Sequence, residues 1–337
     1  MAQPVCLQIL EGHDLRLPQM ADVMDQIMRG SWSEDEIVQF LTVLNQKGEA
    51  VEELAGAAAA LRKHMTPIRS HHERLVDTCG TGGDASGTFN ISTAAALVTA
   101  AAGVPVAKHG NRGITSRSGS ADVLAALGVD IEAPVVVVER CLDELGIGFC
   151  FAPQLHPSMR HVAAARKRMG TPTIFNLLGP LCNPASAPFQ LLGVGRPHLR
   201  QHIASALALL GTRRALVVTG EDGLDEVTLS GATHVIEIRA DEHHTWDWQP
   251  NDFGVPASDR QCLLIDGPAD SARLIRSVLD GAAGPPRDIV LVNAAAALWT
   301  SGENESLPAC VQQAAAAIDS GAAKKLLARL ATLSHRR

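Results

Sequence analysis

Apolar residues in the first 65 or so positions recur at the spacing of amphipathic helices. Between Pro18 and Met28 they fall three or four residues apart, which predicts one helical face. Ser33, followed three residues later by Glu36, forms a capping-box pattern at the start of a second helix. A third helix is expected from about Ala50 to His64, and Met65-Thr66-Pro67 then breaks the pattern. The opening of the chain therefore predicts a small all-helical domain.

From Leu75 onward, short β-rich runs alternate with helical ones, and we see no internal repeat. The expected strands are Leu75–Cys79, Val104–Lys108, Ile147–Phe151, Ala215–Thr219, Thr233–Ile238 and Ile289–Val292. The expected helices are Thr93–Ala102, Ala121–Leu127, Val136–Leu145, Met159–Met169, Leu199–Leu210, Ala269–Leu279, Ala294–Ser301 and Leu307–Ala331. This alternation predicts a larger α/β domain with a mainly parallel central sheet flanked by helices. Ligands of such sheets bind at the carboxyl ends of the strands, so the loops that follow strands matter most.

We expect a helical domain over residues 1–68, joined by a segment near 165–185, and an α/β domain over residues 72–337. Aromatic residues make up only 3% of the chain and the net charge is −7, so a sequence-tolerant nucleic-acid surface is not expected. The seven cysteines show no zinc-type spacing, which favours a reducing compartment. Residues 91–106 are too short and too weakly apolar to cross a membrane, and no signal-peptide pattern opens the chain. We expect a cytoplasmic protein.

A glycine-rich loop follows the first expected strand. Cys79-Gly80-Thr81-Gly82-Gly83-Asp84 is succeeded by Gly87-Thr88-Phe89-Asn90-Ile91-Ser92-Thr93 and an alanine-rich helix. Closely spaced glycines let backbone amides approach an anion, and the helix start adds unpaired N–H groups. The sequence matches neither the P-loop nor the Rossmann template. The pattern favours anion binding over a plain glycine turn.

A second loop, Lys108 to Ser120, combines positive charge, hydroxyl groups and glycines. Its cations are Lys108, Arg112 and Arg117, and it leads into another helix start. Such a loop suits a polyphosphate, although a solvated surface loop would have the same composition. Two loops of this kind in succession favour phosphate binding.

A third loop, Gly220 to Glu226, holds four carboxylates in six residues. Carboxylates this close repel one another unless they are solvated or share a cation, and Mg²⁺ usually takes one or two of them together with substrate phosphates. An exposed acidic turn is the alternative. Elsewhere, His156 and His161 lack the spacing of a helical metal pair, and His243 and His244 are expected at the surface.

An ordered set of short motifs resembles the anthranilate phosphoribosyltransferase family over nearly the whole length. The set comprises MDQIMRG, NQKGE, GTGGD, TFNIST, KHGNR, SGSADVL, HPSMRHVAAAR, FNLLGPLCNP and GEDGLDE. The resemblance implies transfer of a phosphoribosyl group from phosphoribosyl diphosphate (PRPP) to the amine of anthranilate in tryptophan biosynthesis. It also implies dependence on Mg²⁺ and a homodimer formed through the helical domain.

The resemblance further implies roles for individual residues. The PRPP site would comprise Gly80, Gly83, Asp84, Thr88, Asn90, Ile91, Ser92, Thr93, Lys108, His109, Gly110, Asn111, Arg112, Gly113, Ile114, Thr115, Ser116 and Ser120. Mg²⁺ would be held by Ser92, Asp225 and Glu226. Anthranilate would meet Gly80, Asn111 and Arg166, and the catalytic group would be Lys108, Asn111 and Arg166. The role of Arg166 rests on the resemblance alone. The pattern of residues by itself indicates phosphate binding by the first two loops and metal binding by the third.

Two alternative functions remain open from the sequence. A nucleoside phosphorylase would share the architecture but use phosphate and a nucleobase in place of PRPP and anthranilate. A non-catalytic paralogue that binds nucleic acid is the other, and the acidic net charge argues against it. The segment from about Ala240 to Asp266 matches the family only loosely and receives no role.

Overall fold

The first part of the chain is a group of helices. The computed structural model of the protein describes residues 2–84, 86–113, 117–240 and 242–336. The group consists of α1 (Ala2–Leu10), α2 (Leu17–Met28), α3 (Glu34–Lys47) and α4 (Val51–His64), so α1 is added to the three expected helices. The capping box at α3 is confirmed: the Ser33 hydroxyl accepts the Glu36 N–H at 3.3 Å, and the Glu36 carboxylate accepts the Ser33 N–H at 2.9 Å.

The second part of the chain contains one mainly parallel sheet, as predicted. Its strands in the described residues are β1 (Val76–Gly80), β2 (Val106–Gly110), β3 (Ile147–Phe151), β4 (Phe189–Gly193), β5 (Arg214–Gly220), β6 (Thr233–Arg239) and β7 (Glu242–Trp248). Their order is β3-β2-β1-β4-β5-β6-β7. The first five strands pair in parallel, and β6 and β7 extend the sheet as an antiparallel edge.

Helices connect and cover these strands. They are α5 (Ile91–Ala101), α6 (Ser120–Ala126), α7 (Val135–Leu145), α8 (Ala152–Leu155), α9 (Arg160–Met169), α10 (Phe175–Leu178), α11 (Arg200–Leu209), α12 (Pro268–Leu279), α13 (Pro285–Thr300), α14 (Leu307–Asp319) and α15 (Ala322–Ser334).

Three sequence-based expectations about elements were wrong. The predicted strand Ile289–Val292 lies inside α13, where every residue from Ile289 to Leu298 is buried. A segment buried on all sides shows no alternation of polar and apolar residues, so its sequence does not distinguish a helix from a strand. The predicted helix Leu307–Ala331 is two helices, because Gly321 takes a left-handed φ of 72° between them. Strands β4 and β7 were not expected at all.

Both faces of the sheet are buried, and alternate residues of a strand enter different cores. In β5, Leu216 and Val218 belong to one core, which α5 and α12–α15 complete. Ala215 and Val217 belong to the other, which extends through α9–α11 into α1–α4. Burial on both faces explains why β3 and the middle of β5 are nearly continuous apolar runs in the sequence.

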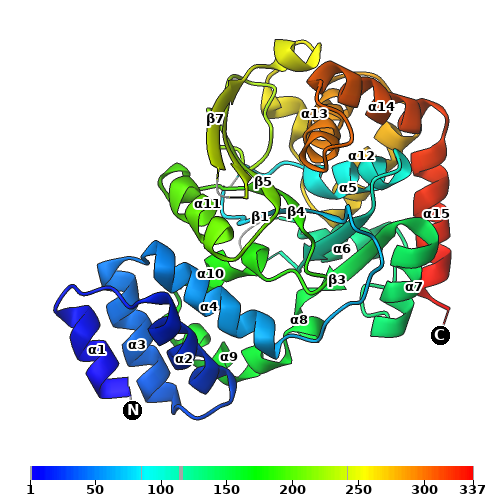
Figure 1. The fold of residues 1–337 in the computed structure, drawn as a ribbon. Coiled ribbons are helices and arrows are strands. Elements are labelled where there is room, and N and C mark those ends of the chain that lie inside the picture. Colours follow the sequence, from blue (N-terminus) through cyan, green and yellow to red (C-terminus); the bar gives the residue numbers. More distant parts are fainter. Residues whose placement is uncertain (1, 85, 114–116, 241, 337) are drawn as a thin grey trace.

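The two cores set the shape of the molecule. Figure 1 shows α1–α4, with α9 and α10, at one end and α12–α15 at the other, with the sheet between them. Helix α4 packs against α11, which in turn lies against β5 and β6. No helix in the described part of the chain has the length and apolar character that crossing a membrane would require.

Candidate active site

The three loops singled out in the sequence follow β1, β2 and β5. All three strands run parallel in one sheet, so their carboxyl ends lie at the same edge. Each strand ends in a glycine: Gly80, Gly110 and Gly220. A Cβ added at Gly80 would lie 2.6 Å from an Asp225 carboxylate oxygen, so a larger residue there would displace the Asp225 side chain.

The glycine-rich loop after β1 is held directly by the acidic loop after β5. The Gly82 N–H donates to Asp225 Oδ2 at 3.0 Å, and the Thr81 N–H donates to the Gly193 carbonyl at 2.8 Å. A Cβ at Gly193 would overlap the backbone carbonyl of Asp225. The end of β4, at Gly193, therefore contacts both loops at the point where they meet.

The start of α5 joins the same centre through Ser92. The Ser92 N–H donates to Glu226 Oε1 at 3.0 Å, and the Ser92 hydroxyl lies 3.1 Å from Lys108 Nζ. The Lys108 ammonium also donates to the Thr78 carbonyl and is buried. All three loops are thus linked through Ser92, Lys108 and the carboxylates of the acidic turn.

The four carboxylates of the acidic loop divide into two pairs. Glu221 accepts the Ala232 N–H at 3.2 Å and Asp222 accepts the Thr228 hydroxyl at 3.0 Å, so these two stabilise their own turn. Asp225 and Glu226 instead face the glycine-rich loop and α5.

Burial and mutual repulsion raise the pKa of both inward carboxyl groups. Desolvation is the main cause for each, followed by the charge of Asp84 on Asp225 and the charge of Asp225 on Glu226. Together with the Ser92 hydroxyl they form an oxygen-rich donor set, the chemistry that Mg²⁺ prefers. Among the described residues Asp84, Asp225 and Glu226 do not form one compact three-ligand group.

The loop after β2 folds back onto the start of α6. Asp122 accepts the Gly113 N–H at 2.8 Å and the Gly119 N–H at 3.0 Å, and it pairs with Arg112 at 3.2 Å. Asn111 is exposed, and its carbonyl accepts the Ala121 N–H at 3.1 Å. The predicted residues Ile114, Thr115 and Ser116 lie outside the described residues.

Asn90 connects the first two loops. Its side-chain amide donates to the Ser118 carbonyl at 3.1 Å, and its oxygen accepts the Ser118 hydroxyl at 2.8 Å and the Ser271 hydroxyl at 3.0 Å. The Asn90 side chain thus links the first two loops to α12, and a ligand that contacted it would have to replace some of these hydrogen bonds.

Several predicted substrate residues turn their side chains inward. Ile91 and Thr93 are buried, so they can meet a ligand only through the backbone. Burial also lowers the pKa of Lys108, and Asp77 is the first of several carboxylates that oppose this effect. Lys108 is buried and contacts the Ser92 hydroxyl, so its charge acts on the site from the protein interior and not from the loop surface.

His109 is also buried and makes a hydrogen-bonded chain away from the loops. Its Nδ1 lies 3.0 Å from the Gly179 carbonyl, and its Nε2 lies 3.2 Å from His156 Nε2. Burial lowers the pKa of His109 to about 3 and that of His156 to about 4, so both are neutral at physiological pH. The carbonyl only accepts, so His109 carries its proton on Nδ1 and accepts from His156. The pair fastens the end of β2 to the segment that leads into α9.

Arg166, on α9, has the environment of a binding residue. It is half-buried, its guanidinium lies 5.5 Å from the Phe175 ring centroid, and no acidic partner for it exists among the described residues. Burial lowers the pKa of Arg166, with no carboxylate to oppose it. Arg168, two positions further along the helix, is instead exposed and pairs with Asp35 at 2.6 Å. A desolvated guanidinium without a counter-ion is suited to a ligand carboxylate.

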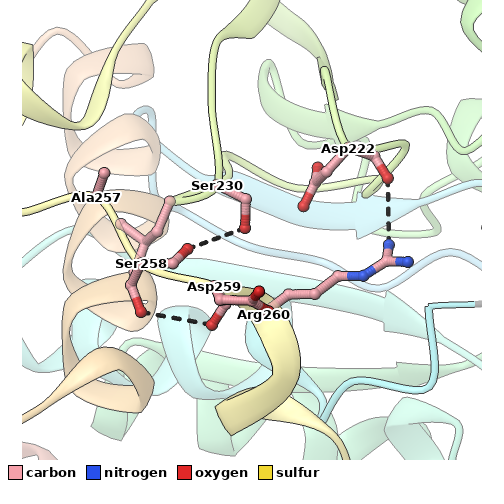
Figure 2. Close-up of a pocket in the computed structure, with 7 residues that line it drawn as sticks. Asp222, Ser230, Ala257, Ser258, Asp259 and Arg260 are labelled. Carbon is pink, nitrogen blue, oxygen red and sulfur yellow. Dashed lines mark hydrogen bonds between the residues drawn. The ribbon is translucent and has the colours of Figure 1, made fainter.

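A surface cavity of about 530 Å³ lies beside this centre but is not part of it. It is lined by Asp222, Leu229, Ser230, Ala257, Ser258, Asp259 and Arg260. Figure 2 shows Arg260 reaching the Asp222 backbone carbonyl, at 3.2 Å, across this cavity. The acidic turn therefore separates the cavity, on the side of Asp222, from the loops, on the side of Asp225.

Sequence reasoning missed several supporting residues. Gly193 and Gly195 went unnoticed because β4 was not expected; a Cβ at Gly195 would lie 2.9 Å from the Asp84 nitrogen. The segment around Leu263, which was given no role, pairs with the glycine-rich loop, since the Phe89 N–H donates to the Leu263 carbonyl at 2.9 Å. The Gly193-Val194-Gly195 sequence, read as the end of a strand, would have identified the two glycines. No sequence signal marks the pairing of the segment around Leu263 with the glycine-rich loop.

Comparisons with known proteins agree with this geometry. Residues 3–65 match the helical bundle domain of the glycosyl transferase family, and residues 72–324 match its a/b domain. Anthranilate phosphoribosyltransferase of Rhodopirellula baltica is 51% identical over 320 residues, covering 95% of this chain and 94% of its own. The Anaeromyxobacter sp. (strain Fw109-5) protein of the same name is 49% identical and covers 99% of both chains.

Solved structures agree as well. Anthranilate phosphoribosyltransferase of Thermus thermophilus has a TM-score of 0.92 at 42% identity, covering 98% of this chain and 99% of its own. The Saccharomyces cerevisiae enzyme in complex with PRPP and Mg has a TM-score of 0.90 at 29% identity, covering 99% and 97%. The resemblance inferred from the motifs is confirmed, and the chain belongs to the anthranilate phosphoribosyltransferases of the glycosyl transferase family.

Proposed function

We propose that this protein transfers the 5-phosphoribosyl group of PRPP to the amine of anthranilate, with release of diphosphate, in tryptophan biosynthesis. The observation that carries the proposal is the convergence of three strand-end loops, in which Asp225 accepts the Gly82 N–H and Glu226 accepts the Ser92 N–H. Yeast anthranilate phosphoribosyltransferase, which shares the fold, binds PRPP and Mg in its solved complex.

The metal part of the site would be Asp225, Glu226 and the Ser92 hydroxyl. Two half-buried carboxylates with raised pKa values carry an electrostatic cost that a divalent cation relieves. When bound, Mg²⁺ neutralises the diphosphate and stabilises it as a leaving group. Lys108 adds a positive charge from beneath, 3.1 Å from the Ser92 hydroxyl.

The phosphate part would be formed by the glycine-rich loop, the start of α5 and the loop after β2. Gly82 and Gly83 take left-handed φ values of 64° and 79°, which turn the backbone without a side chain in the way. Gly80, Asp84, Thr88, Asn90 and Ser120 are the remaining polar or glycine positions that we assign to PRPP in this region. Arg112 is half engaged by Asp122, but it remains exposed enough to reach a phosphate.

The acceptor part would be Arg166, Asn111 and Gly80. Arg166 would bind the anthranilate carboxylate, which supplies the counter-ion that the guanidinium lacks. The aromatic amine is already nucleophilic, so the protein needs no strong base. It needs to hold the amine against C1 of the sugar and to exclude water, which would hydrolyse PRPP. We propose that the helical domain, residues 1–68 with the segment near 165–185, closes against the α/β domain over residues 72–337 to do this.

Fluorescence of anthranilate provides the test. Purified protein should consume anthranilate only when PRPP and Mg²⁺ are both present, releasing one diphosphate per anthranilate. Incubation with nucleosides and inorganic phosphate should yield no free base. Loss of the base from a nucleoside, without use of anthranilate, would instead support the nucleoside phosphorylase alternative.

We also propose a cytoplasmic homodimer that forms through the helical domain. Leu7 and Leu10 are more than half exposed and lie three residues apart on α1, so this domain presents two neighbouring apolar side chains. Light scattering of the protein should give twice the chain mass, and Leu7→Lys with Leu10→Lys should give the single-chain mass. Dimers in that variant would place the interface elsewhere.

A further inference from the structure

A cluster of metal-ligating side chains lies outside the candidate active site, on the segment that joins α4 to β1. His71 and His72 belong to that segment and Asp143 to the last turn of α7, and one ligand atom of each lies within 4.8 Å of the others. His71 Nδ1 is 3.0 Å from Asp143 Oδ1, and the two imidazole centroids are 4.2 Å apart. No other group of His, Cys, Asp or Glu in the described residues meets this spacing.

The cluster sits where the linking segment is fastened to the α/β part. The Arg69 N–H donates to Glu139 on α7 at 2.8 Å, and His72 Nε2 bonds to the Leu142 carbonyl at 3.0 Å. The Ile68 N–H donates to the Pro184 carbonyl at 3.0 Å. The segment runs directly into β1, which carries the glycine-rich loop. An additional bond at this point would therefore tie the connection between α4 and β1 to the end of α7.

The protonation of the two imidazoles suits a metal ion. A carbonyl can only accept, so His72 carries its proton on Nε2 and keeps a lone pair on Nδ1. A histidine that donates one N–H to a backbone carbonyl while its other nitrogen binds metal is the usual supporting arrangement. His71 Nδ1 already points at a carboxylate, and a cation would replace the shared proton between them.

The distances and the local charge agree with a small transition-metal ion. Ligand atoms about 2.0–2.1 Å from a tetrahedral Zn²⁺ lie about 3.3 Å from one another. The pair formed by His71 and Asp143 is already near that separation. One ligand atom of each of the three residues lies within 4.8 Å of the others, so movement of the exposed His71 and Asp143 side chains would close the set while His72 keeps its bond to the Leu142 carbonyl. The carboxyl end of α7, which is the negative end of the helix dipole, lies here, and Glu144 follows Asp143 in the chain.

We propose that His71, His72 and Asp143 bind a divalent transition metal, Zn²⁺ in the first place, and thereby fasten the segment between α4 and β1 to α7. The imidazole ligands separate this site from the one formed by Asp225 and Glu226, whose oxygen ligands suit Mg²⁺. Water would complete the coordination, because His71 and Asp143 are exposed. The bound ion would cross-link segments about 70 residues apart and so stabilise the fold.

Equilibrium dialysis against Zn²⁺, in excess Mg²⁺, tests the proposal. The protein should carry Cys262→Ser, because Cys262 is the exposed thiol among the described cysteines. We expect one Zn²⁺ per chain, with affinity at least about tenfold lower in His71→Ala and in Asp143→Asn. The thermal midpoint should rise with Zn²⁺ in the parent protein and stay constant in both variants.

The chain supplies a matched control in His243 and His244 on β7. They are also adjacent and exposed, and His244 lies 3.4 Å from Glu242, but neighbouring side chains of a strand point to opposite faces. The double variant His243→Ala, His244→Ala should bind Zn²⁺ like the parent. Loss of binding in this control, or undiminished binding in both His71→Ala and Asp143→Asn, would overturn the proposal. So would the absence of saturable binding in the parent. The altered side chains are exposed, and far-ultraviolet circular dichroism without metal would verify that each variant is folded.

Discussion

Replacing Asp225 with Asn and Glu226 with Gln should abolish turnover and at the same time stabilise the metal-free protein. Each amide keeps an oxygen that can accept the backbone N–H now bound by the carboxylate, from Gly82 and Ser92 respectively. The loops should therefore stay in place. What the variant loses is two negative charges that desolvation and mutual repulsion make unfavourable without a cation.

The size of the gain follows from the raised pKa values. A tenfold change in proton affinity corresponds to about 1.4 kcal/mol for each group. Both carboxyl groups keep some contact with water, so we expect the free energy of unfolding at about pH 8 to rise by only about 1–3 kcal/mol in total. That corresponds to an increase in the thermal midpoint of about 2–6 °C.

The pH dependence has a definite sign. The pKa of each carboxyl group is higher in the folded protein than in the unfolded chain, so the folded protein retains protons that the unfolded chain has released. Wild-type stability should fall as the pH rises through these raised values, whereas the stability of the variant should change less over the same range. Thermal melts at a series of pH values, without and with Mg²⁺, measure both effects.

The control variant is Glu221→Gln with Asp222→Asn, which makes the same change of charge in the same loop. These two carboxylates stabilise their own turn, so this variant should keep Mg²⁺-dependent turnover and gain no stability. Near-normal turnover in Asp225→Asn, Glu226→Gln would refute the metal role, and melting below wild type at about pH 8 would refute the electrostatic reasoning.

The surroundings of the loops give three further predictions. Arg166→Ala should raise the KM for anthranilate about tenfold or more with little change in the KM for PRPP, because one charged hydrogen-bond donor is lost. Arg168→Ala is the control, since Arg168 already pairs with Asp35. Equal effects on the KM of both substrates in steady-state kinetics would contradict the binding of anthranilate by Arg166. Gly193→Ala should destabilise the fold by about 2–3 kcal/mol in urea denaturation, because its Cβ would overlap the acidic turn, whereas Gly179→Ala meets open space and should cost little. Burial lowers the pKa of His156 to about 4, below that of a histidine in the unfolded chain, so the folded protein loses stability as the pH falls. From about pH 6.5 to pH 5 the free energy of unfolding should fall by about 2 kcal/mol on this account. In acid melts His156→Gln should show a smaller decline of stability with falling pH, and a decline equal to that of the wild type would argue against this role of His156.

The loops and their strands could be predicted because their signals are local. Glycines that close short β-rich runs, as at Gly80 and Gly110, indicate strand ends, and the acidic loop stands out by charge alone. The convergence of the loops follows from parallel pairing, which the alternation of strands and helices predicts.

The remaining features depend on contacts that a linear pattern does not contain. Strand β4 contains a buried Gln190, whose amide donates to the Pro180 carbonyl at 2.6 Å, so its polarity is satisfied only in three dimensions. Strand β7 is an exposed antiparallel edge with polar residues on both faces, which gives no period of two. The sequence places Lys108 and His109 where an expected strand passes into a loop, but both side chains are buried in β2.

The proposed function depends above all on the loops after β1, β2 and β5 gripping one metal-chelated PRPP molecule. Anomalous diffraction from crystals grown with PRPP and Mn²⁺ in place of Mg²⁺ would locate the ion directly. We expect a manganese peak about 2.1 Å from a carboxylate oxygen of Asp225 or Glu226, with the diphosphate against Gly82 and Gly83. A peak that has no ligand from the acidic turn, or a diphosphate in the cavity beside Arg260, would contradict it.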